Sequence, residues 1–290
     1  LNNMTKKLSL LLMGLLAFCG CCKHETFTLW QLPSQVNTIG NSYVIRSANG
    51  KIFVMDGGGE DEKSYLKGFI EALGSKVDAW FISHLHNDHM GALKLLLEEP
   101  NGLEIDRIYH SRFTDEQLSR EGEGWQRYYE AFYALLDTIE GVEVIDCHSG
   151  DELEMDGVNF KILSEKNPEI KDFNNSSMVI KMWDKHKSFI FLGDLGVKGG
   201  NKLLASEYAA DLECDYLQMA HHGQAGCSKG FYEAVKFRAC LWPTPSWVYN
   251  NNLGQGFNTG GLKTIEVRGW MDELGITEHY RSFEGLVKIE

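Results

Sequence analysis

The segment HLHNDH, which begins at His84, places three of the chain's 10 histidines and one aspartate within six positions. It directly follows the apolar run VDAWFIS (77–83). If that run is a strand, His84 and His86 project to the same side, because side chains alternate along a strand. Asp88 and His89 then follow where the chain turns into a helix. One segment could therefore present two imidazoles to one divalent ion, and a carboxylate and an imidazole to a second.

Imidazole nitrogens and carboxylate oxygens suit Zn²⁺, and also Mn²⁺ or Fe²⁺. A site for two ions needs further ligands, including one that both ions share. Two later apolar runs end in suitable residues: KSFIFLGD ends at Asp194, and CDYLQMAHHG carries His221 and His222 near its end. Strand ends are rigid positions from which to present ligands. The sequence therefore predicts two divalent ions as cofactors, with zinc as the first choice and manganese or iron as alternatives.

Short strands and amphipathic helices surround these motifs along the whole chain. Strands are predicted where β-type residues alternate between turn residues, and helices where apolar residues recur every three to four positions. The turns Asn49-Gly50 and Asp156-Gly157 predict hairpins. The predicted strands are 26–32, 41–47, 51–59, 77–83, 105–111, 142–146, 151–163, 176–184, 187–194, 214–223, 239–245 and 285–290. The predicted helices are 61–74, 90–100, 115–140, 199–210, 231–237 and 262–275.

Residues outside the motifs are expected to have structural roles. The helical segment 115–140 should break near Gly122, and its aromatic stripe, which begins at Trp125, should pack in the core. His110 and His148 are single histidines without ligand spacing, which favours structural or surface roles. The cysteines beyond the first 25 residues form no CxxC pair, which favours buried thiols.

With these residues in this order, the chain resembles the metallo-β-lactamase superfamily. The matching motifs are MDGG (55–58), HLHNDH, GD (193–194) and HHG (221–223), and the resemblance extends over roughly residues 26–290. HxHxDH is a specific motif. The other three motifs are weak individually, but their occurrence in the family's order supports the resemblance. The closer likeness is to the hydrolase domains of competence-type DNA-uptake proteins and to phosphorylcholine esterases, which share stretches like NNSSMV and HHG.

The resemblance implies an α/β fold. We expect a four-layer αββα sandwich built of two similar halves, with a two-metal site at one edge of the sheets. The resemblance also implies the ligands by position. It assigns His84 and His86 to the first ion. It assigns Asp88, His89 and His221 to the second ion, and Asp194 to the bridge between the two ions.

Three further residues receive roles from the same resemblance. Asp56 is expected behind the ligands, as a carboxylate that orients a histidine or the loop. Asp88 and His222 are the expected catalytic residues, with His222 near the substrate as a proton donor. Many superfamily members have another histidine where this chain reads DFNNSSMV. Asn174 is the candidate replacement, as a weak ligand or a substrate contact, since an amide oxygen binds Zn²⁺ less well than imidazole.

Phosphodiester hydrolysis is the function that these residues predict first. Two ions lower the pKa of a bridging water and so give hydroxide at neutral pH, and paired ions suit in-line displacement at phosphorus. The nearest likeness is also to phosphodiester-cleaving groups. Hydrolysis of a carboxylic ester, lactone, thioester or β-lactam is the alternative within this fold. A different class of function is a non-catalytic metal-binding surface protein that uses segment 125–136 to bind a partner, although the intact Asp194 argues against it.

The first residues predict a leader. The segment MTKK precedes an apolar run (8–18) that is too short to span a membrane. FCGCCK follows, and a small residue before Cys21 resembles a bacterial lipoprotein signal. We therefore expect a leader over 1–21, lipid attachment at Cys21, and a single hydrolase domain over 22–290. The protein would be exported and anchored to the cell envelope through its lipid alone; a plain secretory signal is the alternative.

The charge of the chain restricts its partners. The formal net charge is −13, and no basic stripe is present. Such a surface repels polyanions on average, so nucleic acid is a disfavoured substrate. Small-molecule or wall-linked esters are the expected substrates. Nothing in the sequence specifies an oligomeric state.

Overall fold

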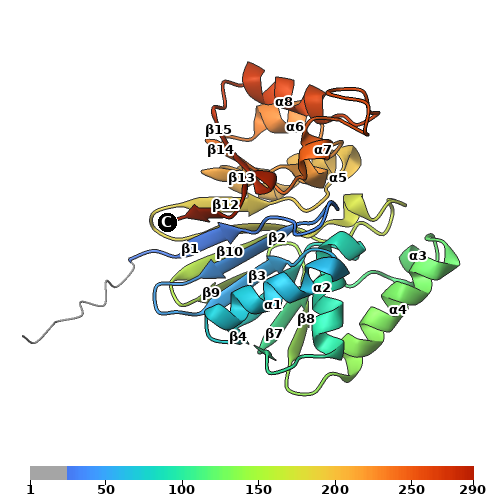
Figure 1. Ribbon diagram of the computed structural model, residues 1–290, viewed down its shortest axis with the longest axis vertical. Helices are drawn as coiled ribbons and strands as arrows, with labels where there is room; N and C mark the ends of the chain where they lie inside the picture. Colours follow the sequence, from blue (N-terminus) through green and yellow to red (C-terminus); the bar gives the residue numbers. More distant parts are fainter. Residues whose placement is uncertain (1–24) are drawn as a thin grey trace, which may run out of the picture.

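The computed structural model describes residues 25–290, so the predicted leader and Cys21 lie outside the described residues. Two seven-stranded sheets lie face to face, and helices cover their outer faces (Figure 1). This arrangement confirms the predicted four-layer αββα sandwich. No helix among residues 25–290 is long and apolar enough to cross a membrane.

The first sheet takes most of its strands from the first half of the chain. Its strand order is β16-β1-β2-β3-β5-β7-β8, and a small separate pair, β4 with β6, lies between elements of this half. The bounds are β1 (Thr28–Gln31), β2 (Ser42–Arg46), β3 (Ile52–Asp56), β4 (Lys76–Val77), β5 (Ala79–Ile82), β6 (Glu104–Ile105), β7 (Arg107–His110), β8 (Glu143–Asp146) and β16 (Val287–Ile289).

The second sheet is built from the second half of the chain in the order β15-β14-β13-β12-β11-β10-β9. Both sheets are parallel where the site motifs follow: β3, β5 and β7 run parallel, as do β12, β13 and β14. The bounds are β9 (Glu152–Met155), β10 (Val158–Ser164), β11 (Val179–Trp183), β12 (Ser188–Phe191), β13 (Tyr216–Gln218), β14 (Ala239–Trp242) and β15 (Glu278–Arg281).

Helices cover the two outer faces separately (Figure 1). α1, α2 and α4 pack on the first sheet, and α5, α6 and α8 on the second. The helices are α1 (Lys63–Ala72), α2 (Asn87–Glu98), α3 (Asp115–Leu118), α4 (Glu123–Thr138), α5 (Val197–Leu204), α6 (Lys229–Ala234), α7 (Ser246–Tyr249) and α8 (Thr264–Glu273). The 3-10 helices are η1 (Glu60–Glu62), η2 (Asn174–Ser176), η3 (Glu207–Asp211), η4 (Ala220–Gly223) and η5 (Ser282–Glu284).

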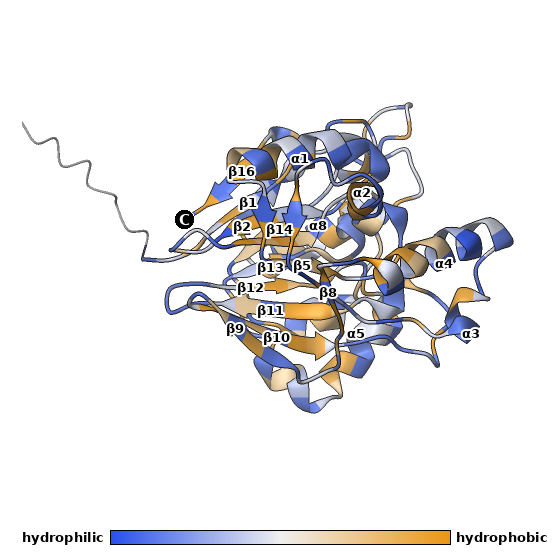
Figure 2. Cartoon of the chain, turned by 90° about the horizontal axis from the view of Figure 1, so that it is seen from below, coloured by the Kyte–Doolittle hydropathy of each residue, from blue (hydrophilic) through white to orange (hydrophobic). Residues whose placement is uncertain are grey.

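Aromatic side chains fill the space between the sheets, where Figure 2 shows hydrophobic strands enclosed by more polar outer surfaces. Phe81 of β5 stacks on Tyr109 of β7, with ring centroids 4.7 Å apart. The same ring stacks at 4.9 Å on Phe160 from the opposite sheet, and Phe53 meets Phe160 edge-on at 5.3 Å. Burial of these rings holds the two sheets together and so fixes their edges relative to one another.

The predicted elements differ from the structure in several places. α2 begins at Asn87, before the predicted residue 90, because the extended His86 already serves as its N-cap. β15 was not predicted, since EHYR has no apolar alternation; it pairs in parallel with β14. The break in the helical segment 115–140 is confirmed, with Gly122 as the N-cap of α4. Core packing of the aromatic stripe holds for Phe132 but is wrong for Trp125, which is 46% exposed.

The cysteine prediction is confirmed. All four described cysteines are free and buried: Cys147, Cys214, Cys227 and Cys240.

Replacing Phe160 by alanine should lower the free energy of unfolding by about 3–5 kcal/mol, because it removes a ring that contacts both sheets. Urea denaturation measures this loss. The control is Leu253→Ala, whose side chain is 59% exposed and whose loss should stay within about 0.5 kcal/mol. Equal losses in the two variants would contradict the assignment of Phe160 to the core.

Candidate metal centre

Asp56 organises the first-sheet side of the site. It ends β3 in a left-handed backbone conformation, with φ of 58°. Its carboxylate accepts hydrogen bonds from the Ser83 backbone N–H at 2.7 Å, the Ser83 hydroxyl at 2.9 Å and the Asn41 amide at 2.6 Å. His89 Nδ1 lies 2.8 Å from the same carboxylate. Asp56 therefore lies behind His89, where the sequence places an orienting carboxylate, and leaves His89 Nε2 directed to the other side.

Two histidines of HLHNDH form a first cluster with Asp194. His84 Nε2 lies 3.0 Å from His86 Nδ1 and 3.9 Å from Asp194 Oδ2. One ligand atom from each of the three residues lies within 4.8 Å of the others. His84 and Asp194 are buried and His86 is half-buried. These residues can hold one divalent ion.

A second cluster combines the first turn of α2 with the second sheet. His89 Nε2 lies 3.0 Å from Asp194 Oδ1. His222 Nε2 lies 3.4 Å from the same oxygen and 3.2 Å from Asp88 Oδ2. One ligand atom from each of these four residues again lies within 4.8 Å of the others. The two carboxylates and two imidazoles are a ligand set that suits zinc, manganese or iron.

Asp194 belongs to both clusters. Its Oδ1 faces His89 and His222, and its Oδ2 faces His84. The Asp194 backbone N–H donates to Ser177 Oγ at 3.0 Å, which fixes the turn after β12. A carboxylate that directs one oxygen to each cluster has the geometry of a bridge between two ions.

Several buried polar atoms of the site have no hydrogen-bond partner, which agrees with a site for metal ions. Among the described residues, His89 Nε2, His222 Nε2, Asp194 Oδ1 and Asn174 Oδ1 are buried and make no hydrogen bond. An unsatisfied buried polar atom costs about 1–3 kcal/mol. The first three of these atoms converge on one another, so the residues fit a cation that would satisfy them together.

The positions of the adjacent histidines His221 and His222 differ from the prediction. We expected His221 in the second cluster and His222 near the substrate, but the structure places His222 in the cluster. Both have left-handed backbones, with φ of 52° and 54°, and Gly223 follows with φ of 75°. His222 is held from behind, since its Nδ1 lies 2.9 Å from the Pro243 carbonyl and its own carbonyl accepts from Thr244 Oγ1 at 2.5 Å. Two left-handed residues in succession turn the rings apart, which spacing alone does not indicate.

His221 instead lies beside Asn174. Its Nε2 is 3.4 Å from Asn174 Nδ2 and 3.8 Å from Asp194 Oδ2, and its side chain is 27% exposed. Asn174 thus lies next to the first cluster, where the sequence suggested a weak ligand or a substrate contact. Its carbonyl oxygen is the buried acceptor without a partner.

The charges of the site are strongly coupled. Burial alone would raise the pKa of Asp194, but His89 and His222 outweigh it and hold that pKa well below its usual value. Burial alone would lower the pKa of His222, but Asp194 and Asp88 raise it to about 9. The same carboxylates, with Asp56, raise the pKa of His89 well above its usual value. Burial, and then the neighbouring His89 and His86, lower the pKa of His84.

Two serines and one asparagine of the site were not found from the sequence. Ser83 contacts both Asp56 and His84 Nδ1, the latter at 3.1 Å, and Asn41 is a buried donor to Asp56. Ser177 holds the backbone of Asp194. Only Ser83 carries a usable signal, because it directly precedes HLHNDH.

The single histidines lie outside both clusters, as expected. His110 ends β7 and is buried against Tyr133, and burial lowers its pKa to about 4. His148 is exposed and pairs with Glu165 at 2.8 Å.

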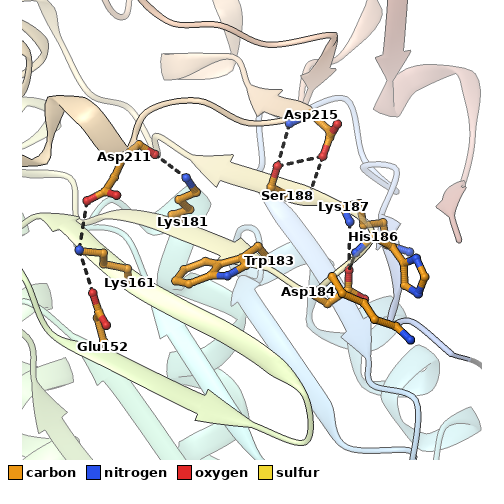
Figure 3. Close-up of a pocket in the computed structure, with 11 residues that line it drawn as sticks. Glu152, Lys161, Lys181, Trp183, Asp184, His186, Lys187, Ser188, Asp211 and Asp215 are labelled. Atoms are coloured by element: carbon orange, nitrogen blue, oxygen red, sulfur yellow. Dashed lines mark hydrogen bonds and ion pairs between the residues drawn. The ribbon is translucent and has the colours of Figure 1, made fainter.

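A separate concavity of about 520 Å³ lies on the second sheet, and Figure 3 shows its lining. Several of its charged groups have partners within the protein. Lys161 pairs with Glu152 at 2.8 Å and with Asp211 at 3.0 Å, and Asp215 accepts from Ser188. It contains none of the residues of the two clusters, and we assign it no role in the chemistry.

A family model decides the assignment of the chain. The model of the metallo-beta-lactamase superfamily matches residues 37–226, more than half of the chain, and the matched segment contains both clusters. The chain belongs to the metallo-β-lactamase superfamily. This confirms the resemblance seen in the motifs. Members of the metallo-β-lactamase superfamily are mostly hydrolases, and the two clusters are candidate metal sites in this member.

One similar protein is ComE operon protein 3 of Bacillus subtilis (strain 168), which is 29% identical over 164 residues. The match covers 54% of this chain and 19% of that protein. This member of the metallo-β-lactamase superfamily therefore spans about a fifth of the length of the relative it matches.

Two solved structures share the fold. YhfI from Bacillus subtilis, a metallo-β-lactamase fold protein, superposes with a TM-score of 0.56 at 12% identity over 91% of this chain and 100% of YhfI. CmlA, a diiron β-hydroxylase from Streptomyces venezuelae, superposes with a TM-score of 0.54 at 12% identity over 92% of this chain and 54% of CmlA. At these identities the likeness establishes the metallo-β-lactamase fold alone.

Replacing His222 by alanine should reduce the metal content from two equivalents towards one, because it removes an imidazole from the second cluster. His221→Ala should keep the second equivalent. Metal analysis after dialysis against zinc measures both variants. The control is His148→Ala, an exposed histidine outside the clusters. Loss of the second ion in His221→Ala but not in His222→Ala would reverse the assignment.

Metal affinity should rise with pH between pH 6 and pH 9. In the metal-free protein the raised pKa values keep protons on His89 and His222 at neutral pH, and an ion must displace them. These protons compete less as the pH approaches the folded-state pKa. Calorimetry in two buffers of different ionisation enthalpy at pH 7 should detect release of about one to two protons per chain. Binding without proton release would contradict the protonation of these imidazoles.

Proposed function

We propose that this chain hydrolyses phosphodiesters at two divalent ions held by the two clusters. The observation that carries the proposal is the position of Asp194, which directs one carboxylate oxygen to each cluster. The first ion would be held by His84, His86 and Asp194. The second would be held by Asp88, His89, Asp194 and His222. Zinc is our first choice, with manganese or iron as alternatives.

When bound, the paired ions lower the pKa of a water and neutralise the charge that develops on the substrate. The residues of the chain hold this arrangement in place. Asp56 fixes His89 from behind, and the Pro243 carbonyl fixes His222. Four of these ligands, His84, His89, Asp194 and His222, are buried, which excludes bulk water around them and strengthens their electrostatic effect.

The substrate would approach from the side of Asp88 and His221, whose side chains are 26% and 27% exposed. His221 is not needed in the second cluster, so it takes the position near the substrate that the sequence suggested for His222. Asn174 lies beside it and offers an amide. These two side chains can donate hydrogen bonds to a substrate oxygen at the first cluster.

Two features favour a phosphodiester over a carbonyl compound. The motifs resemble those of phosphodiester-cleaving groups within the superfamily, and an asparagine replaces the third histidine of the first site, as in that subgroup. The alternative, a carboxylic ester, lactone, thioester or β-lactam, would use the same ions.

We also propose a small or wall-linked substrate and an exported, lipid-anchored protein. The net charge of −13 disfavours long polyanions. The motif at Cys21 supports the anchor.

Residues 25–290, loaded with Zn²⁺ or Mn²⁺, should hydrolyse bis-p-nitrophenyl phosphate. Asp88→Ala and Asp194→Asn should each lower kcat/KM by roughly 100-fold or more, because each removes a charge that positions an ion. Release of p-nitrophenolate measures turnover, and metal analysis of each variant shows whether an ion was lost. His148→Ala is the control and should match the wild type.

Turnover that survives in both variants would contradict the proposal. Bound metal with no phosphodiesterase activity would also overturn it. Activity on a lactone or thioester panel would then identify carbonyl chemistry, and inactivity on every ester would favour a metal-binding surface protein.

A further inference from the structure

Ser83 connects the two clusters from behind their metal-facing atoms. Its hydroxyl lies 2.9 Å from Asp56 Oδ2 and 3.1 Å from His84 Nδ1. His84 belongs to the first cluster, and Asp56 already contacts His89 of the second cluster at 2.8 Å. One buried carboxylate is therefore connected to a histidine of each cluster, directly to His89 and through a serine hydroxyl to His84.

The direction of these hydrogen bonds follows from the groups themselves. A carboxylate only accepts, so the single proton of the Ser83 hydroxyl is donated to Asp56. Towards His84 the same oxygen can then only accept, which requires a proton on His84 Nδ1. His84 Nε2 is left with its lone pair, and this atom faces the first cluster, 3.0 Å from His86 Nδ1 and 3.9 Å from Asp194 Oδ2. The bond that Ser83 accepts thus selects the form of His84 that can bind an ion.

Contacts from both halves of the chain hold the Ser83 hydroxyl in this position. The Ser83 backbone N–H donates to Asp56 Oδ1 at 2.7 Å, and the Ser83 carbonyl accepts from the Met178 backbone N–H at 2.7 Å. The residue is 5% exposed. It packs against the turn before Asp194, where a Cβ added to Gly193 would lie 2.8 Å from Ser83 Oγ. The hydroxyl is thus fixed in place and sheltered from water that could replace it.

We propose that Ser83 is a positioning residue of the first metal site, through which Asp56 orients His84 as it orients His89 by direct contact. This inference rests on the proposed function only in assuming that the clusters hold ions. Outer partners of this kind orient a metal ligand and fix its tautomer, and their loss typically lowers metal affinity by roughly 10- to 100-fold. Loss of the Ser83 hydroxyl should therefore weaken the first ion, whereas His89 keeps its contact with Asp56.

Ser83→Ala tests the proposal, with Ser188→Ala as the matched control. The Ser188 hydroxyl also donates to a carboxylate at 2.9 Å, that of Asp215, but in the concavity that contains no residue of either cluster. In competition with a chelating dye, Ser83→Ala should bind one of two zinc ions roughly 10- to 100-fold more weakly, whereas Ser188→Ala should match the wild type. In a His222→Ala background, which should keep the first ion, Ser83→Ala should weaken the ion that remains. Unchanged affinity for that ion would overturn the proposal.

A second measurement separates positioning from a general loss of stability. Nitrogen NMR of the imidazole rings should show a proton on His84 Nδ1 in the wild type, with and without zinc. In Ser83→Ala this proton should exchange faster with water, whereas the proton on His89 Nδ1 should stay protected by Asp56. A wild-type proton on His84 Nε2 instead, or equal loss of protection at both histidines in Ser83→Ala, would overturn the role of Ser83. If the wild type binds no zinc, the proposed function fails by itself, and the tautomer of His84 still decides the role of Ser83.

Discussion

The buried carboxylate of Asp194 is the interaction on which the site depends. A buried charge is costly unless oppositely charged groups and hydrogen bonds compensate it. Here the compensation comes from both sheets: Asp194 follows β12, His84 and His89 follow β5, and His222 follows β13. The two sheets must therefore bring three strand ends to one point. The aromatic contacts between Phe53, Phe81 and Phe160 fix that relation at the centre of the molecule.

The need to bring these strand ends to one point also explains the unusual backbone at the site. Asp56, His221 and His222 have left-handed conformations, which non-glycine residues adopt at a cost of order 1–3 kcal/mol each. Each conformation is held by specific bonds, such as that from Thr244 to the His222 carbonyl. Gly223 continues the turn because a side chain there would meet the Trp242 ring at 2.3 Å. The rigid core around these turns stabilises geometries that the local sequence disfavours.

The helical segment between β7 and β8 is bonded to the loop that precedes β11. Gln117 donates to the Ser176 hydroxyl at 3.2 Å, and Arg120 donates to the Pro168 carbonyl at 2.7 Å. These bonds fix the loop that carries Phe173 and Asn174. The aromatic stripe that we expected in the core is therefore divided: Phe132 and Tyr129 pack in the core of the first half, whereas Trp125 is exposed and stacks on Tyr129.

The sequence indicated the αββα fold through the resemblance of its motifs to the superfamily, and it singled out most residues of the two candidate clusters. Spacing carries the second part: His84 and His86 share one side of an extended segment, and Asp88 and His89 fall in the first turn of α2. Only the tertiary structure decided between His221 and His222, because adjacent residues in left-handed conformations diverge in a way no periodicity records. It also decided that β15 joins β14 and that Trp125 is exposed. Those outcomes depend on contacts between segments far apart in the chain, so the local sequence does not specify them.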